Sequence, residues 1–321
     1  MVRATVPSLA KLNLDLRVLH RNGDGYHELR TIFQSINLRD ILKVELEPAS
    51  STRIDLDSSP DIPDNLVVRS AKIVLNHLRV KARVRFFLRK RIPMGAGLGG
   101  GSSNAAAVLI ALPALLRRPI PISTLMQLAQ DLGSDVPFFL LGGTALGFGR
   151  GTELYPLPDQ PRHPVLVVST GVHVSTPEAY QALGREVTNA LTWQAESPIL
   201  GEFQTIAWAL AGSNIGGLSV GELPLHNDFE QPVFGIHPRL SSVVRKLKKL
   251  GAKPAAMTGS GSALFGVFSG VPEMLAAASH FPAGAAFPAR FVSRSQYRTL
   301  WRRALGEASE LSCFAAKQGG Y

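Results

Sequence analysis

The chain has 321 residues, of which 45% are hydrophobic and 18% charged; this composition excludes intrinsic disorder and predicts two domains with a core of normal size. A single cysteine, Cys313, excludes an internal disulfide and is typical of a reducing, cytoplasmic compartment. The formal net charge of +10 favours an anionic partner, either a nucleic acid or a phosphorylated small molecule.

Residues 1–90 are predicted to form mainly β-strands. Residues 10–16, 41–47 and 83–88 alternate apolar and polar side chains, which is the period of a half-buried strand. A turn is predicted at residues 21–25, and residues 65–78 have helical spacing. The basic side chains between residues 81 and 91 follow the strand period, so we interpret them as a solvated face and expect no nucleic-acid partner.

Two helices are predicted next, at residues 102–116 and 123–132. Residues 92–116 carry no charge and are long enough to cross a bilayer, but glycine and serine fill the first half and Pro113 interrupts the second. The N-terminal segment likewise lacks the apolar run of a signal peptide. We therefore expect a buried helix and no membrane partner.

Four prolines between residues 156 and 164 mark the predicted domain boundary, which divides the chain into residues 1–155 and 156–321. Beyond it the sequence predicts a strand at residues 165–168, a helix beginning at Pro177 and a basic amphipathic helix at residues 240–250. Strands gathered early, with helices distributed later, indicate an α+β fold.

The segment with the most specific chemistry is glycine-rich and lies between a predicted strand and an alanine-rich helix. Five glycines in seven positions allow the backbone to turn its N–H groups inward, and two serines are predicted to cap the following helix. A ring of donors at a helix N-terminus is a preformed anion site. The predicted phosphate loop consists of Pro93, Met94, Gly95, Ala96, Gly97, Leu98, Gly99, Gly100, Gly101, Ser102 and Ser103.

Two other glycine motifs fit this loop poorly. A dinucleotide fingerprint needs an acid about twenty residues downstream, and none occurs before Asp131. A Walker A loop ends in Gly-Lys-Ser/Thr, whereas this loop offers Gly-Ser-Ser. A flexible linker is disfavoured because a strand and a helix bracket the segment.

This loop resembles the phosphate-binding motif of the GHMP kinases, the superfamily of galactokinase, homoserine kinase and mevalonate kinase. Residues 4–14 resemble the N-terminal motif that carries a substrate-side lysine, and residues 257–266 resemble the C-terminal glycine motif that closes over the active site. The resemblance runs from about residue 7 to 268 and is thin across residues 185–225. It implies an N-terminal ATP-binding domain, a C-terminal substrate-side domain and an active site in the cleft between them.

Within the superfamily, residues 10–14, 24–29 and 133–139 are similar to kinases of the non-mevalonate isoprenoid pathway that act on a small cytidine-diphosphate substrate; residues 227–230 agree. The resemblance implies phosphorylation of the 2-hydroxyl of that substrate by ATP. No cluster of His, Cys and Asp has metal-ligand spacing, so no protein metal site is expected and Mg²⁺ should arrive with ATP.

The family's catalytic aspartate corresponds to Asp135, in the context Gly-Ser-Asp-Val-Pro, and the resemblance assigns it as the base. The sequence alone predicts equally well that Asp135 caps a helix ahead of Pro137. Lys11 is implied as the electrostatic partner of Asp135, the alternative being an exposed strand lysine. Asn13 shares the Lys11 face and is a candidate to hydrogen-bond the same alcohol.

The remaining candidates concern the two ends of the cleft. Tyr26 and His27 supply an aromatic face and a polar edge for cytidine, with Tyr180 as the other face of a sandwich and Thr176 beside it. Further candidates are Gly259 and Ser260 for the substrate diphosphate, where a tight turn is the alternative, and Asn65 and Lys90 for the adenine pocket.

Three other functions stay open at this point. The first is a GHMP kinase that acts on a different alcohol, for which Tyr26 and His27 have no evident use. The second is a non-catalytic protein of the same fold, which should have lost Lys11 or Asp135, although both are present. The third is a basic nucleic-acid binder.

Overall fold

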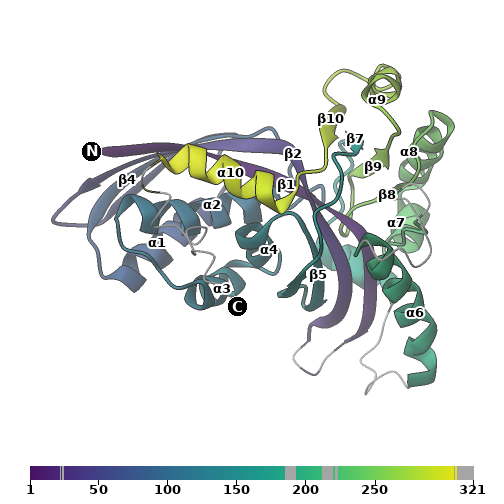
Figure 1. The fold of residues 1–321 in the computed structure, drawn as a ribbon, viewed down its shortest axis with the longest axis horizontal. Helices are drawn as coiled ribbons and strands as arrows, with labels where there is room; N and C mark the ends of the chain where they lie inside the picture. The colour runs from purple at the N-terminus through teal and green to yellow at the C-terminus, as the bar shows by residue number, and fades with distance from the viewer. Residues whose placement is uncertain are drawn as a thin grey trace.

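The computed structural model describes residues 1–21, 23, 25–184, 193–211, 220, 223–306 and 308, and for residues 193–200 the backbone alone. Two β-sheets lie next to each other along the length of the molecule, each accompanied by helices (Figure 1). This arrangement confirms the predicted α+β class. Cys313 and two positions of the predicted turn, 22 and 24, lie outside the described residues.

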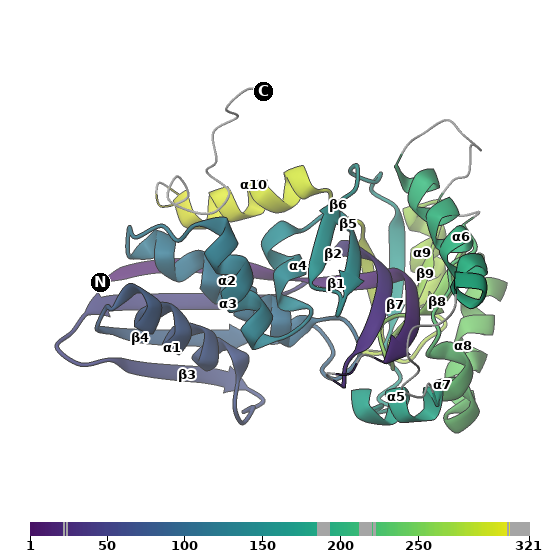
Figure 2. The same ribbon diagram turned by 90° about the horizontal axis from the view of Figure 1, so that it is seen from below.

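The first sheet, as described, has six strands in the order β3–β4–β2–β5–β6, with β1 paired to β2. Only β3 and β4 pair in parallel. The strands are β1 (Val2–Arg21), β2 (His27–Pro48), β3 (Arg53–Ser59), β4 (Ala82–Arg89), β5 (Thr144–Gly149) and β6 (Glu153–Pro156). The helices of this half are α1 (Leu66–Leu78), α2 (Gly100–Leu115), α3 (Ile122–Leu132) and α4 (Val136–Leu141). They lie together against the sheet (Figure 2).

The second sheet, within the described residues, has four antiparallel strands in the order β10–β7–β9–β8. Its strands are β7 (Pro164–Val168), β8 (Ala255–Met257), β9 (Leu264–Val267) and β10 (Ala286–Arg290). The helices that follow β7 in the chain are α5 (Thr176–Leu183), α6 (Trp193–Leu210), α7 (Glu230–Ile236), α8 (Pro238–Lys249) and α9 (Val271–Ala278). The last helix of the described residues, α10 (Arg294–Leu305), runs back alongside the first sheet (Figure 1).

The two long strands β1 and β2 join the halves. Their middle parts contribute side chains to the cores of both halves and are therefore buried on both faces. One face belongs to the core beneath α2, which includes Leu9 and Phe33. The other face packs on the second sheet, where Leu12 and Ile36 share a core with Phe265. Residues 10–16 alternate apolar and polar side chains, yet they are not half-buried, because Lys11, Asn13 and Asp15 are buried as well. The strand predicted at residues 10–16 is part of the twenty-residue β1.

The amphipathic helices begin and end close to their predicted limits, since each buries one apolar stripe. One local prediction is wrong: Ser102 and Ser103 do not cap α2. The helix begins earlier, at Gly100, and Gly99 occupies the N-cap position with a left-handed φ of 69° and no side-chain capping bond. Glycine backbone makes this turn without help from a side chain, which leaves both serines inside the first helical turn.

The predicted division into residues 1–155 and 156–321 stays a prediction. Strands up to Pro156 belong to the first sheet, and strands from Pro164 belong to the second. Helix α10 nevertheless packs in the core of the first half, through Tyr297 and Trp301. The core of the first half is therefore built from two separate parts of the chain, the N-terminal elements and α10.

Candidate active site

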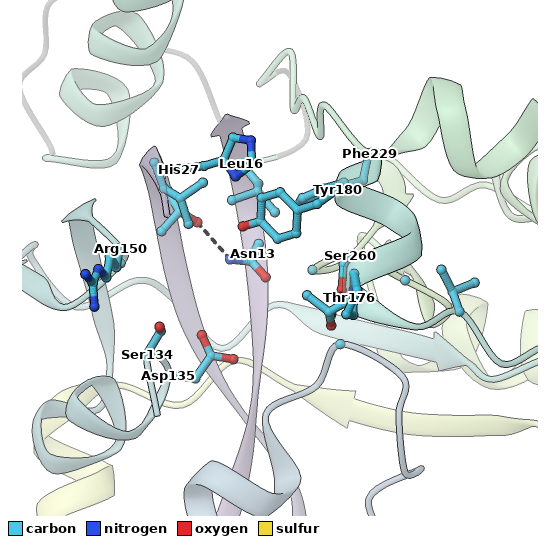
Figure 3. A pocket seen from close by; sticks show the side chains of 18 of the residues that line it. Asn13, Leu16, His27, Ser134, Asp135, Arg150, Thr176, Tyr180, Phe229 and Ser260 are labelled. Atoms are coloured by element: carbon cyan, nitrogen blue, oxygen red, sulfur yellow. Dashed lines mark hydrogen bonds between the residues drawn. The ribbon is translucent and has the colours of Figure 1, made fainter. Parts of the chain in front are cut away.

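A cleft of about 1230 Å³ lies where the two halves meet. It is lined by β1 and β2, by the phosphate loop, by the segment before α4, by residues 173–184 around the start of α5, and by a turn at residues 259–261. Figure 3 shows Asp135 and Ser134 on one side of this cleft, and Thr176 and Ser260 on another. Candidates from widely separated parts of the sequence thus face one space.

Lys11 and Asp135 form an ion pair in this cleft, with Lys11 Nζ 3.5 Å from Asp135 Oδ2. The lysine is only 3% exposed, and its Nζ also donates to Asn13 Oδ1 at 2.6 Å. Asn13 in turn donates from Nδ2 to Thr31 Oγ1 on β2 at 2.8 Å (Figure 3). Lys11 is therefore a buried cation held by neighbours, and the alternative of an exposed strand lysine is excluded.

Asp135 occupies the N-cap position of α4, but its side chain makes no capping hydrogen bond. The carboxylate is 34% exposed and points into the cleft (Figure 3). Among the described residues that line the cleft, it is the only carboxylate. Its position at the helix start thus serves to aim the side chain rather than to cap the helix.

The phosphate loop places the N-terminus of α2 at the cleft, where Gly95, Gly97 and Ser102 line the wall. Because the first N–H groups of a helix lack intrahelical partners, this end attracts anions. Ser103 Oγ is buried and has no hydrogen-bond partner among the described residues. Other loop residues point away: Ala96 and Leu98 pack in the core between the sheets.

The C-terminal glycine turn lies directly against the phosphate loop. A Cβ atom at Gly97, whose φ is +75°, would overlap the carbonyl oxygen of Thr258. Thr258 Oγ1 accepts a hydrogen bond from the backbone N–H of Asn13 at 2.9 Å. Asn227, from the segment before α7, donates to the carbonyls of Met257 and Gly259, both at 2.9 Å. The turn is thereby fixed to both the loop and β1.

Gly259 and Ser260 line the cleft within this turn, next to the start of α5. Ser260 Oγ lies 3.0 Å from Thr176 Oγ1, so the two hydroxyls form one polar spot. Thr176 begins α5, whose N-terminus is closed by a capping box between Ser175 and Glu178. Three of the predicted substrate-side residues therefore lie together.

The aromatic candidates occupy the far end of the cleft. His27 and Tyr180 stack, with ring centroids 4.7 Å apart, and Phe229 meets Tyr180 edge-on at 4.8 Å. Burial, followed by the charge of Asp135, raises the pKa of Tyr180 to about 12. Tyr26 is 51% exposed, and the guanidinium of Arg150 lies 3.5 Å from its ring centroid. Tyr180 thus stacks directly on His27, and the expected sandwich, with a base between Tyr26 and His27 on one face and Tyr180 on the other, stays a prediction.

Two predicted nucleotide residues have structural partners outside the cleft. Asn65 caps α1 by accepting a hydrogen bond from the backbone N–H of Val67 at 3.0 Å. Lys90 is largely buried and pairs with Asp40 through a short contact. Neither side chain lines the cleft.

Several cleft residues are absent from the sequence prediction, among them Ser134, Arg150 and His173. Ser134 precedes the catalytic candidate directly, and Arg150 stands in a glycine-rich segment, so both had a local signal. His173 has none: it is brought to the cleft by the strand β7 that ends before it, and its ring lies against Gly95 of the phosphate loop.

Metal clusters and membrane-spanning helices are both absent from the described residues. They contain no group of three or more His, Cys, Asp or Glu side chains that could hold a metal ion. Within the same residues, no helix has both the length and the apolar character needed to cross a membrane.

The comparisons with known proteins agree with this geometry. Residues 65–143 match the GHMP kinases N terminal domain, and residues 202–282 match the GHMP kinases C terminal domain. A 4-diphosphocytidyl-2-C-methyl-D-erythritol kinase from Solibacter usitatus is 47% identical over 95% of this chain and 93% of its own length. A protein of the same name from Thermus thermophilus is 41% identical, over 81% of this chain and 86% of its own length.

Two solved structures of kinases have a fold similar to that of this chain. A crystal structure of 4-(cytidine 5'-diphospho)-2C-methyl-D-erythritol kinase superposes with a TM-score of 0.72 at 38% identity, covering 89% of this chain and 98% of the other. Homoserine kinase from Cytophaga hutchinsonii, at 17% identity and a TM-score of 0.65 over 89% and 93% of the two chains, shares the fold. This chain belongs to the GHMP kinases and, within them, to the 4-diphosphocytidyl-2-C-methyl-D-erythritol kinase family.

Proposed function

We propose that this kinase transfers the γ-phosphoryl group of ATP to the 2-hydroxyl of 4-diphosphocytidyl-2-C-methyl-D-erythritol, in the non-mevalonate route to isoprenoid precursors. One observation carries the proposal: the Lys11–Asp135 pair lies in one cleft between a phosphate-binding loop and a stack of aromatic rings. That order suits a nucleotide triphosphate at one end, a nucleoside at the other and a reacting hydroxyl between them.

Asp135 is the proposed base. As the oxygen of the substrate hydroxyl forms its bond to the γ-phosphorus, the bond from that phosphorus to the ADP oxygen breaks, and Asp135 accepts the hydroxyl proton. Its partial exposure leaves room for the alcohol. Tyr180 is a poor alternative, because a phenol with a pKa of about 12 keeps its own proton at neutral pH and acts as a donor.

Lys11 and Asn13 are proposed to orient the reacting groups. The Lys11 ammonium lies beside the Asp135 carboxylate and is anchored on Asn13 Oδ1, so its position is fixed before substrate arrives. A fixed cation near the transferring phosphoryl group stabilises charge that develops in the transition state, without a cost for reorganisation.

The nucleotide is assigned to the loop at the start of α2. Gly95, Gly97 and Ser102 line the cleft there, and the backbone N–H groups of the glycine segment and the Ser102 hydroxyl are the proposed donors to the triphosphate. Mg²⁺, when bound with ATP, neutralises phosphate charge. Such an ion would be held mainly by phosphates and water, as Mg²⁺ usually is beside a nucleotide. The unpartnered Ser103 hydroxyl is the candidate protein contact to the phosphates or the ion.

The cytidine end is assigned to the aromatic stack. Tyr26, His27 and Tyr180 present ring faces and polar edges, the two features that recognise a base. Gly259, Ser260 and Thr176 line the same cleft, and they are proposed to bind the substrate diphosphate.

The decisive experiment is a measurement of ADP release by the purified protein with ATP and Mg²⁺. The cytidine-diphosphate substrate is compared with mevalonate, homoserine and galactose, and a reaction without any alcohol measures background ATP hydrolysis. Release above background with the cytidine compound alone is the expected result. Release with another alcohol instead would discard the proposed substrate and keep the kinase.

A further inference from the structure

Asp40 is a fully buried carboxylate at the point where β4 leaves the first sheet. It lies on β2 directly before residues 41–48, which pair with β4, and the ladder ends at the pair Ile41 and Arg89. After Arg89 the chain turns away from the sheet toward the phosphate loop. Asp40 therefore lies beside residues 90–92, the first residues after β4 that no longer pair with β2.

Four donors from two segments converge on this carboxylate. Oδ1 accepts hydrogen bonds from the backbone N–H groups of Arg91 at 2.7 Å and of Ile92 at 2.9 Å. Oδ2 accepts from Asn104 Nδ2 at 3.2 Å and from Lys90 Nζ through a short contact. A carboxylate has about four acceptor sites, so these donors fill it.

The donors lie on either side of the phosphate loop. Arg91 and Ile92 precede the loop directly, and their N–H groups, of which that of Ile92 is buried, need an acceptor once the chain has left the ladder. Asn104 follows the loop, within the first part of α2. One side chain thus holds the segment before the loop and the helix after it, and Lys90 balances its charge.

We propose that Asp40 is a positioning residue for ATP: it fixes the end of β4 against the start of α2 and so sets the directions of the loop's N–H groups. The inference rests on the proposed function only in that ATP binds at this loop. The identity of the alcohol does not enter. Since the carboxylate is 0% exposed, it acts on the nucleotide through the loop and not by contact.

The test is Asp40→Asn, which keeps the shape of the side chain but turns one acceptor oxygen into a donor that faces other donors. Isothermal titration with the non-hydrolysable ATP analogue AMP-PNP and Mg²⁺ measures the Kd directly. We expect the Kd to rise by at least about tenfold, because small displacements of a binding loop cost this much or more. In steady-state assays the KM for ATP should rise and the KM for the cytidine substrate should not change.

A matched control separates this role from simple destabilisation. Asp15 on β1 is also fully buried and pairs with Arg17 at 2.9 Å. Asp15→Asn should lower the Tm to a similar degree and leave the AMP-PNP Kd unchanged. Unchanged AMP-PNP binding by a folded Asp40→Asn variant, or an equal loss of binding by Asp15→Asn, would overturn the proposal.

A second variant decides the matter if Asp40→Asn does not fold. Asn104→Ala removes only the link between the carboxylate and α2. We expect the AMP-PNP Kd to rise severalfold with the fold preserved, and no rise would overturn the proposal. Because the titration needs no alcohol, these outcomes are independent of whether the cytidine compound proves to be the substrate.

Discussion

At the scale of single residues, the proposed chemistry depends on Asp135 as the base. Replacement by asparagine keeps the shape of the side chain and removes its ability to accept a proton. We expect Asp135→Asn to lower kcat by about 10²–10⁴-fold, the usual contribution of a general base, with little change in the affinity for ATP. Steady-state kinetics and an AMP-PNP titration measure both. Asp131→Asn, an exposed acid on α3, is the control, and equal kcat values for the two variants would remove the base assignment.

His27 tests the cytidine end of the cleft. His27→Ala deletes a ring that stacks on Tyr180 at 4.7 Å. Loss of a ring that stacks on a base costs about 1–3 kcal/mol, so the KM for the cytidine substrate should rise roughly five- to 150-fold. The KM for ATP should stay unchanged, and the exposed His280→Ala serves as the control. A similar rise in both KM values would place the base elsewhere.

How much of the site the sequence predicts differs from residue to residue. Lys11 and Asp135 were identified by their motif contexts, since a lone lysine in a strand and an aspartate before a proline have ordinary structural explanations. The partners of Asp40 come from residues 90–92 and from α2, so nothing near Asp40 in the sequence marks it. Such buried polar networks are assembled by tertiary contacts, and a single sequence without them predicts only a polar strand residue.

At the scale of elements, the C-terminal glycine turn packs directly against the proposed phosphate loop. A side chain at position 97 would meet the carbonyl of Thr258, and its φ of +75° is unfavourable for any residue except glycine. We expect Gly97→Ala to cost at least about 2 kcal/mol of stability and to lower kcat/KM for ATP. Urea unfolding and steady-state kinetics measure the two effects.

A matched glycine shows what the contact contributes. Gly235 lies in helix α7, and a Cβ atom there would meet nothing within 4 Å. Gly235→Ala should be neutral or stabilise the protein by up to about 1 kcal/mol. If Gly97→Ala were as stable and active as Gly235→Ala, the loop and the turn would not be in contact in solution.

Elements with one apolar face were the ones that the sequence predicted well. The helix expected at residues 65–78 appears as Leu66–Leu78, and the one expected at residues 123–132 appears as Ile122–Leu132. β1 and β2 extend well beyond the predicted residues 10–16 and 41–47, and the pairing of β1 with β2 shifts register between Leu9 and Ala10. A strand can continue past such an irregularity, so the period of the sequence does not give its full length.

At the scale of the whole molecule, the motifs predict two halves and a cleft, but not the return of α10 to the first half. Tyr297 on α10 donates its hydroxyl hydrogen bond to the carbonyl of Phe139 at 2.6 Å, within the helix that begins directly after Asp135. The same ring packs on Gly142, just past the end of that helix. The C-terminal helix thus supports the element that aims the proposed base.

The return of α10 to the first half should contribute measurably to the stability of the protein. Trp301 on α10 is 1% exposed in the core of the first half, and removing a buried tryptophan side chain typically costs about 3–5 kcal/mol. We expect Trp301→Ala to lower the free energy of urea unfolding, followed by circular dichroism, by that amount. Trp208→Ala, at a position 60% exposed on α6, should cost less than about 1 kcal/mol. Equal losses would mean that α10 adds little to the core, and that α4 keeps its place beside the cleft through the N-terminal half alone.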